Sequence, residues 1–467
     1  MGIDIDIELC PSLLEKVSFL GTLLKSFHQG EVAMLKLLEM VFGRKRIERI
    51  TERIGAERLQ EVLQEVACFE TQSFMEKVRG PEGVTSPASA AVMVDGGRYQ
   101  RNEQNPDASS ERSTHWFEYK AGICLELAGR CDGIEPGPTA PDPCPNVPDF
   151  LLNMDYVDKL TREIGQKAAV DAAESADDAA TSEPPHSVRC CEVDSTVDIN
   201  LDSVKSLADL ESKITATVNE KGSSDRRAEK IPMSPKVKNR EVVATVQKGR
   251  RIGAQLASRA WNLGMFQSAF KAFVGDGSAW IWTIHAKYFK PFGFTPILDI
   301  IHAVTYVYAA AMAGRTREKG GPVYRRWVHW LWHGELSELI AALASRQAEL
   351  GLPTAEDSET SPRQIVSKAL TYLQNHQSQM RYPEYRKLGL PITSSHMEST
   401  IKELNYRIKG TEKFWSSEGG ASVLQLKSDT LSSSDPMSKF WETRQNNRTG
   451  FRSNVTAQKC AKAVTAA

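Results

Sequence analysis

The sequence lacks the features that would place it in several common protein classes. Its eight cysteines include no CxxC pair, so a zinc knuckle is not expected. The opening residues, MGIDID, contain no basic segment followed by an apolar run, which argues against a secretory signal. The longest apolar run, residues 297–314, carries Asp299 and His302 and is short for a bilayer span, so it predicts a buried helix. We therefore expect a cytoplasmic, nucleoid-associated protein without a membrane partner.

A marked excess of charge of one sign is also missing. The chain has 467 residues, a formal net charge of −1, 25% charged residues and 41% apolar residues, which is ordinary for a globular protein of up to about three domains. The protein is therefore not a polycation. Any surface for nucleic acid must be local, with acidic segments offsetting it elsewhere.

Residues 1–86 have apolar residues at helical spacing and are expected to form a helical domain. Within it, residues 42–55 are basic, and Arg44, Lys45 and Arg46 form a cluster. Short helices, a turn at Gly55 and clustered arginines are typical of a helix-turn-helix that binds DNA. The alternative is a plain helical bundle whose basic face is only solvated.

The middle of the chain alternates strand and helix patterns. Strands are expected at 89–94, 116–127 and 240–246, then at the apolar run that ends on Asp276, and at 295–299; helices are expected at 252–263 and 279–289. This order is similar to that of the ribonuclease-H-like fold. We therefore expect an α/β protein, with a mixed-sheet core, an all-α insertion and the helical N-terminal domain. In such a sheet the first and fourth strands are neighbours, which would bring Asp95 and Asp276 together.

The same pattern predicts the domain boundaries. The core is expected to span residues 87–437. A Pro-rich and acidic insertion at about 132–236 and a helical insertion at about 303–389 would interrupt it, and a flexible basic tail would follow at 438–467.

Three acidic residues follow or begin such elements. Asp95 ends an apolar run, Asp276 ends another, and Glu398 lies where a helical pattern begins. Converging carboxylates of this kind can hold two divalent cations, Mg²⁺ or Mn²⁺, an arrangement that suits in-line phosphoryl transfer on nucleic acid. Each residue also has a structural interpretation: an Asp-Gly turn for Asp95, a helix N-cap for Asp276, and a favourable helix-dipole interaction for Glu398.

Basic and aromatic residues follow the third carboxylate. The basic ones suit phosphate, and the aromatic ones suit an unstacked base; the predicted DNA-binding residues here are Lys402, Arg407, Lys409, Lys413 and Trp415. A second aromatic group, Trp327, Trp330 and Trp332, has the spacing of a helix core, with DNA contact through Arg325 and Arg326 as the alternative. The Asp299–His302 pair is interpreted as supporting the site.

Three sequence blocks resemble the DDE transposases of bacterial insertion sequences, and among them the Kra-type group of the Mutator-like and hAT-like assemblage. The first block is VDGGR at 94–98. The second is VGDGSAWIW at 274–282 followed by PILDIIHA at 296–303, and the third is LPITSSHMESTIK at 390–402 followed by RIKGTEKFW at 407–415. The resemblance covers roughly residues 88–130 and 238–440. His396 departs from the pattern, because small residues are commoner there in the family.

The resemblance implies a catalytic triad of Asp95, Asp276 and Glu398 that binds two Mg²⁺ ions. It also implies that Asp299 and His302 form the family's C/DxxH motif, although an assignment of Asp299 to the triad stays open. The implied activity is cleavage at transposon ends and strand transfer into target DNA, with terminal inverted repeats as partners and a homo-oligomer on DNA. The alternatives are a nuclease or resolvase of the same fold, a decayed copy that only binds DNA, and an unrelated helical scaffold.

Overall fold

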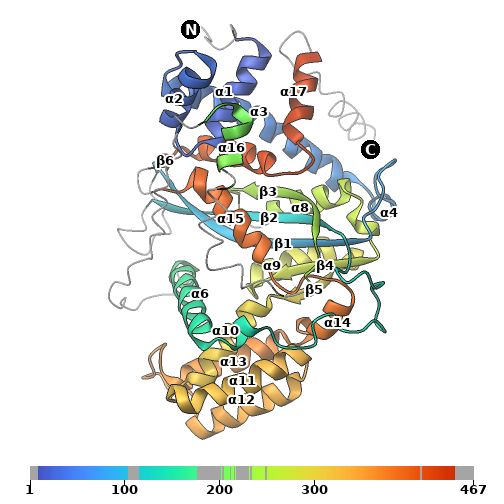
Figure 1. Ribbon diagram of the computed structural model, residues 1–467, viewed down its shortest axis with the longest axis vertical. Coiled ribbons are helices and arrows are strands. Elements are labelled where there is room, and N and C mark those ends of the chain that lie inside the picture. The colour runs from blue at the N-terminus through green and yellow to red at the C-terminus, as the bar shows by residue number, and fades with distance from the viewer. Residues whose placement is uncertain are drawn as a thin grey trace.

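The computed structural model describes residues 9–103, 115–175, 201, 204–210, 212–214, 216, 231, 234–247, 250–410 and 413–446. Its centre is a mixed sheet of six strands, surrounded by helices (Figure 1). The strands are β1 (Ser89–Arg101), β2 (Trp116–Leu127), β3 (Val237–Thr245), β4 (Phe270–Gly275), β5 (Thr295–Leu298) and β6 (Phe414–Trp415). The chain is therefore of the mixed α/β class.

The strand order is β3-β2-β1-β4-β5, and β6 pairs with the far end of β1. β2 is antiparallel to both of its neighbours, β1 and β3, whereas β4 and β5 run parallel to β1. The order places β4 beside β1 although about 170 residues separate them in sequence. The sheet thus brings together the ends of β1 and β4.

Both faces of the sheet are covered, which explains the nearly continuous apolar character of its strands. Side chains alternate between faces along a strand. Ala91 and Met93 of β1 accordingly belong to one apolar cluster, and Val92 and Val94 belong to another. The first cluster includes residues of the helices at 300–312 and 395–408, and the second includes residues of the helix at 250–262.

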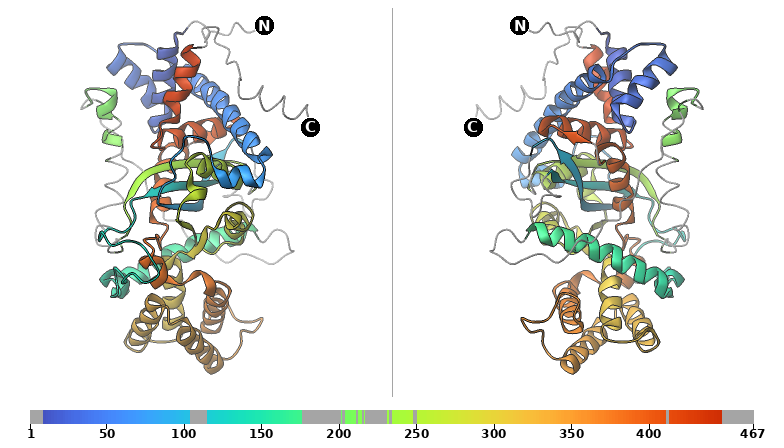
Figure 2. Two further views of the ribbon diagram at one scale, coloured as in Figure 1. Left: turned by 90° about the vertical axis from the view of Figure 1, so that its right-hand side faces the viewer. Right: turned by 90° about the vertical axis from the view of Figure 1, so that its left-hand side faces the viewer.

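The helices form groups around this sheet. Those at the N-terminal side are α1 (Pro11–Leu23), α2 (Phe27–Leu38), α3 (Arg44–Thr71) and α4 (Phe74–Arg79); α16 (Ser417–Thr430) and α17 (Pro436–Asn446) pack with α1 to α3 through a third apolar cluster. Between the strands lie α5 (Asp149–Leu152), α6 (Met154–Ser175), α8 (Arg250–Asn262), α9 (Ala279–Ile284) and α15 (Ser395–Ile408). A helical layer at the opposite end of the molecule contains α10 (Ile300–Met312), α11 (Arg317–His333), α12 (Leu336–Leu350) and α13 (Pro362–Asn375), with α14 (Tyr382–Lys387) following (Figures 1 and 2). Short 3₁₀ or π segments occupy 265–267, 285–289, 290–292 and 377–379.

The prediction of a turn at Gly55 is wrong, because α3 is one continuous helix of 28 residues. Gly55 lies in its middle, where α16 crosses closely. A Cβ at this position would lie 2.4 Å from the carbonyl oxygen of Ser422. Nearby, Nε of Arg58 donates to Oδ2 of Asp429 at 3.0 Å and fastens the two helices together. The glycine therefore permits helix packing and does not make a helix-turn-helix.

The alternative interpretation of Asp95 as part of an Asp-Gly turn is wrong, and the strand expected at 89–94 is longer than predicted. β1 continues through Gly96 and Gly97 to Arg101, and both glycines pair with residues of β2. A Cβ on Gly97 would lie 2.2 Å from the ring of Tyr119. The glycines therefore make room for neighbouring side chains on the sheet.

The expected flexible tail at 438–467 begins within α17, which continues to Asn446; the remainder of that segment lies outside the described residues. Parts of the expected insertion at 132–236 also lie outside them, but α5 and α6 belong to it. In the described part of the chain, no helix combines the length and the apolar character needed to cross a membrane.

Candidate active site

Asp95 lies on β1, and Asp276 directly follows the last residue of the neighbouring parallel strand β4. The β1–β4 pairing ends at Met93 and Val274, so each aspartate lies two residues beyond the last paired position of its strand. Asp95 lies on the same face as Met93, because side chains two residues apart share a face. Oδ1 of Asp95 accepts a hydrogen bond from the backbone of Gly96 at 2.7 Å. Oδ1 of Asp276 accepts one from the backbone of Ser278 at 2.8 Å, just before α9 begins.

Glu398 reaches the same face from α15. This helix packs across β1, and its Met397 and Leu404 belong to the apolar cluster that also contains Met93. Glu398 lies in the first turn and is partly exposed. The site therefore takes its three carboxylates from β1, from the end of β4 and from the start of α15.

Two of these carboxylates act electrostatically on His302 of α10. Burial acts to lower the pKa of His302, but its ion pair with Asp299 and the charges of Asp276 and Glu398 outweigh burial and raise the pKa to about 9. Nδ1 of His302 lies 3.6 Å from Oδ2 of Asp299. The surrounding carboxylates therefore favour the protonated form of the ring.

Asp299 is fully buried, and its oxygens are engaged by protein groups. Oδ1 accepts from the backbone of Ile301 at 2.7 Å and so caps α10. Oδ2 accepts from the backbone of Ser394 at 2.9 Å and from its hydroxyl. Burial acts to raise the pKa of Asp299, but His302 and Ser394 hold it below its usual value.

These contacts make Asp299 a positioning residue. Ser394 is the N-cap of α15, so Asp299 fixes the place where the helix of Glu398 begins. The backbone of Asp299 also donates to the carbonyl oxygen of Gly275 at 2.8 Å, next to Asp276. The residue thus connects the strand end that bears Asp276 with the helix that bears Glu398.

Asp95 is connected to the same face through Tyr119. Burial, and then the charge of Asp95, raise the pKa of Tyr119. The Tyr119 hydroxyl donates to Oδ1 of Asn405 on α15 at 2.8 Å. Tyr119 therefore lies between Asp95 and the helix that carries Glu398.

Aromatic side chains from the helical layer lie beside Asp276. The Tyr372 hydroxyl donates to the backbone carbonyl oxygen of Asp276 at 2.7 Å. Its ring stacks on Tyr306, with centroids 3.9 Å apart. Gly277 has a φ of 101°, and a Cβ there would lie 2.7 Å from the Tyr372 ring. Burial, and then Asp276, raise the pKa of Tyr306.

The three carboxylates fit a hard divalent cation by their chemistry, because Mg²⁺ and Mn²⁺ prefer oxygen ligands. The three carboxylates are not as close together as the ligands of a formed metal site. Among the residues that the structure describes, no group of three His, Cys, Asp or Glu side chains is close enough to hold one metal ion. The donors are therefore suitable and share one region, but they do not form a preassembled site.

The predicted DNA-binding residues divide into exposed and buried ones. Lys402 and Lys409 are exposed, as are Arg44 and Lys45 at the start of α3, whereas Arg46 is partly buried, with its guanidinium 4.8 Å from the ring of Phe42. Arg407 and Trp415 are only 1% and 6% exposed. Neither of these two side chains is on the surface, where it would reach a phosphate.

Arg407 instead fastens the N-terminal helices to α15. Nε donates to the carbonyl oxygen of Gly21 at 2.8 Å, and the guanidinium lies between the rings of Phe27 and Trp415, 4.4 and 4.9 Å from their centroids. Burial lowers the pKa of Arg407 to about 9, although acidic residues of α3 oppose the shift.

Lys413 lies close by. Nζ donates to the carbonyl oxygens of Tyr406 and Arg407, at 3.2 and 3.1 Å. Burial, and then the charges of Arg407 and Lys25, lower the pKa of Lys413 to about 7. This lysine caps the end of α15 and is not presented to a ligand.

The tryptophan cluster of α11 is mainly core, as its spacing predicts. Trp327 and Trp332 are 4% and 0% exposed. Nε1 of Trp332 donates to the carbonyl oxygen of Cys144 at 3.0 Å. Arg325 and Arg326 are on the exposed side of this helix.

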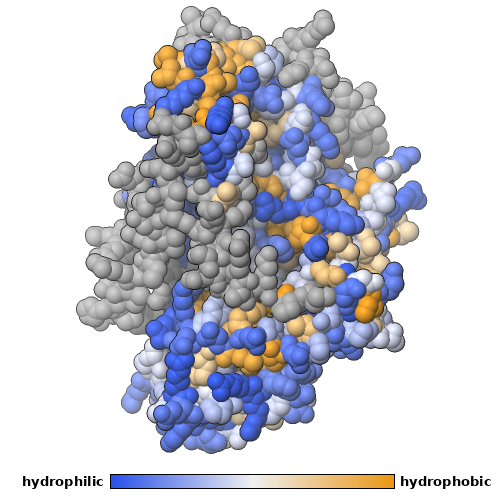
Figure 3. Space-filling model, viewed as in Figure 1, coloured by the Kyte–Doolittle hydropathy of each residue, from blue (hydrophilic) through white to orange (hydrophobic). Residues whose placement is uncertain are grey.

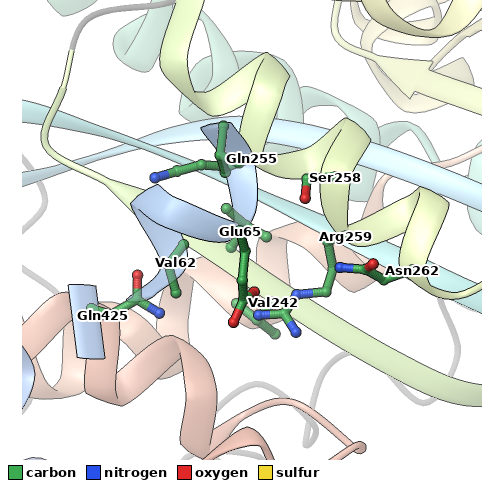
Figure 4. Close-up of a pocket in the computed structure, with 10 residues that line it drawn as sticks. Val62, Glu65, Val242, Gln255, Ser258, Arg259, Asn262 and Gln425 are labelled. Carbon is green, nitrogen blue, oxygen red and sulfur yellow. The ribbon is translucent and has the colours of Figure 1, made fainter. Parts of the chain in front are cut away.

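A small pocket at the β3 edge of the sheet is separate from the carboxylates (Figure 4). Residues of α3, α8, β3 and α16 line it, among them Glu65, Gln255, Arg259 and Gln425. Gln255 is 3% exposed, and neither atom of its amide has a hydrogen-bond partner in the described part of the chain. None of the three site carboxylates lines the pocket.

Comparisons of the chain with protein-family models, with curated proteins and with solved structures found no match.

Proposed function

We propose that the chain is a metal-dependent DNA strand-cleaving and strand-transferring enzyme, a DDE transposase with a ribonuclease-H-like core. The strand order β3-β2-β1-β4-β5, with three antiparallel strands followed by two parallel ones, supports this core. One observation carries the proposal. Asp95 on β1, Asp276 directly after β4 and Glu398 at the start of α15 come to the same region of the sheet, and binding of divalent cations would draw these oxygen donors together for phosphoryl transfer.

In this proposal Asp95, Asp276 and Glu398 would hold Mg²⁺ or Mn²⁺, with two ions for the complete site. Such ions, when bound, lower the pKa of a water and balance the charge that develops on the phosphate. The reaction is hydrolysis of a phosphodiester at the transposon end, followed by attack of the freed 3′-hydroxyl on a phosphodiester of target DNA.

The residues of the chain have separate tasks in this scheme. Asp299 holds the start of α15 and thereby sets the position of Glu398. His302 carries a positive charge among the carboxylates and lessens their mutual repulsion. Arg44 and Lys45 offer positive charge on α3 for DNA outside the site. DNA ends and a second copy of the chain are the partners we propose.

The test is Mg²⁺-dependent cleavage of a plasmid that carries the DNA flanking the coding region. Asp276→Asn removes one negative charge with little change in shape, so cleavage should fall by at least about a hundredfold while DNA binding persists. Asp299→Asn should lower cleavage less, because this residue acts through the position of α15. Glu359→Gln, at an exposed position remote in sequence from the three carboxylates, is the matched control and should cleave normally.

The products separate the related functions. Cleaved ends joined to a second DNA molecule support transposition, whereas cleavage without joining points to a nuclease of the same fold. Full cleavage by Asp276→Asn would refute the assignment of the site.

A further inference from the structure

The helix α15 connects the carboxylate site with the end of the β1–β2 hairpin. Glu398 and Lys402 are four residues apart on α15 and share one face of it, and Lys409, seven residues further on, is the C-cap of the helix. Lys402 and Lys409 are both exposed. The adjacent acidic residue, Glu403, is held by Arg240, whose Nη1 and Nη2 lie 3.2 and 3.1 Å from its oxygens. Two exposed lysines, on α15 and at its C-cap, thus follow Glu398 toward the hairpin.

Aromatic side chains lie around the C-terminal end of α15. Nζ of Lys409 lies 5.5 Å from the centroid of the Trp116 ring on β2. Phe414 of β6 is 44% exposed, although large aromatic side chains are usually covered. The ring of His115 meets it edge-on, with centroids 5.3 Å apart. Parallel pairing of β6 with the end of β1 brings Phe414 to this hairpin.

We propose that these two lysines and the hairpin end bind a single-stranded DNA segment that leads away from the carboxylates. Phosphates would contact Lys402 and Lys409, and bases would stack on Trp116 and Phe414. The choice of DNA as ligand rests on the proposed function. The stacking surface is an additional binding site, apart from the reacting phosphate.

The dimensions fit a short segment of strand. At a rise of 1.5 Å per residue, Lys409 lies about 16 Å from Glu398 along the helix axis. Stacked nucleotides at a spacing of about 3.4 Å cover that length in about five residues. A single strand is favoured over a duplex because paired bases keep their faces stacked on one another, whereas unpaired bases can stack on exposed rings.

The charges near this surface favour an acidic peptide less strongly than they favour single-stranded DNA. On the hairpin itself, Arg101 pairs with Glu103 and its guanidinium lies 4.2 Å from the Phe117 ring. Arg101 and Glu103 therefore offset each other's charge at the end of β1. The free energy of ligand binding therefore has to come from stacking on the rings and from the two lysines. This combination suits nucleic acid, which has both bases and phosphates, better than a carboxylate-rich peptide.

The experiment measures binding of the full chain to fluorescein-labelled DNA by anisotropy, in EDTA so that no cleavage occurs. The probes are a 20-nucleotide oligo(dT) and a 20-base-pair duplex. Trp116→Leu and Phe414→Leu should each weaken oligo(dT) binding by about 5- to 100-fold and change duplex binding little. Lys409→Gln should lower the dependence of oligo(dT) affinity on salt by about 0.7 in the logarithmic slope. Lys439→Gln, at an exposed position of α17, is the matched control.

Far-UV circular dichroism and a urea midpoint confirm that each variant is folded. Unchanged oligo(dT) affinity in Trp116→Leu and Phe414→Leu would overturn the proposal, as would no binding by the wild type or an equal loss on duplex. The two proposals fail separately. A chain that loses oligo(dT) binding in these variants but never cleaves DNA keeps the strand-binding site and refutes the enzyme, whereas normal cleavage with unaltered oligo(dT) binding refutes only the strand-binding site.

Discussion

Replacing Lys413 should change how the stability of the protein depends on pH. A lysine has a pKa of about 10.4 in water, and burial beside Arg407 lowers the pKa of Lys413 to about 7. The difference between these values corresponds to about 5 kcal/mol of unfavourable free energy when the group is charged in the folded state. The ammonium's hydrogen bonds to the carbonyl oxygens of Tyr406 and Arg407 keep the side chain in place.

The direction in which stability changes with pH follows from how many protons Lys413 binds in the folded and unfolded states. Below pH 7 both states are protonated, so the full penalty applies. Between pH 7 and about 10.4 the unfolded chain binds a proton that the folded chain does not, so stability rises with pH, by about 1.4 kcal/mol per pH unit once the folded state is deprotonated. Over the interval from pH 7 to pH 9, the wild type should gain about 2 kcal/mol relative to Lys413→Met, which has no proton to lose.

Urea unfolding, followed by circular dichroism at pH 7, 8 and 9, measures this difference. The comparison between wild type and Lys413→Met removes the contribution of all other titrating groups that the two proteins share. Lys439→Met, at an exposed position of α17, should track the wild type at every pH. Parallel stability curves for the wild type and Lys413→Met would refute the claim that a buried cation is held at the end of α15.

Two further variants test other parts of the structure. Gly55→Val should lower the free energy of unfolding by about 1–3 kcal/mol, because its side chain would meet the backbone of Ser422, whereas Gly137→Ala, with open space around it, should be neutral by the same urea measurement. His302→Gln should show the opposite pH trend to Lys413→Met. The pKa of His302 is raised to about 9, so its contribution is fully present below pH 6.5, and the wild type should lose about 2.5 kcal/mol relative to the variant as pH rises from 6.5 to 9. An unchanged difference over that range would contradict the ion pair with Asp299.

The sequence is informative about the strands and about the residues at their ends. Alternating and continuous apolar runs predict β2, β4 and β5 closely, because those patterns reflect burial on the sheet. The proximity of Asp95 to Asp276 is expected only if the strand order is assumed, since about 180 residues separate them. The register of β1 with β4 supplies that information.

The failures concern glycines and buried cations. Gly55, Gly96 and Gly97 look like turn residues in sequence, but each makes room for a neighbour that is distant or on another strand. The sequence predicts that Arg407 is a surface cation. A pattern of basic residues does not reveal that the rings of Phe27 on α2 and Trp415 on β6 pack against this arginine. Such close approaches depend on tertiary packing, which local spacing does not encode.

The residues of the candidate site are far apart in sequence, so they are synthesised at different times. Glu398 is made roughly 300 residues after Asp95, and at about 5–20 residues per second this interval lasts from about 15 s to 60 s. During this interval β1 has no β4 to pair with until β4 has been made, and it lacks α15 until the end. Likewise, the face of α3 that packs against α16 stays uncovered until α16 has been made. A nascent chain therefore holds the first carboxylate without the third. The three carboxylates can assemble only after these roughly 300 residues have been made, and α3 lacks its packing partner until α16 has been synthesised.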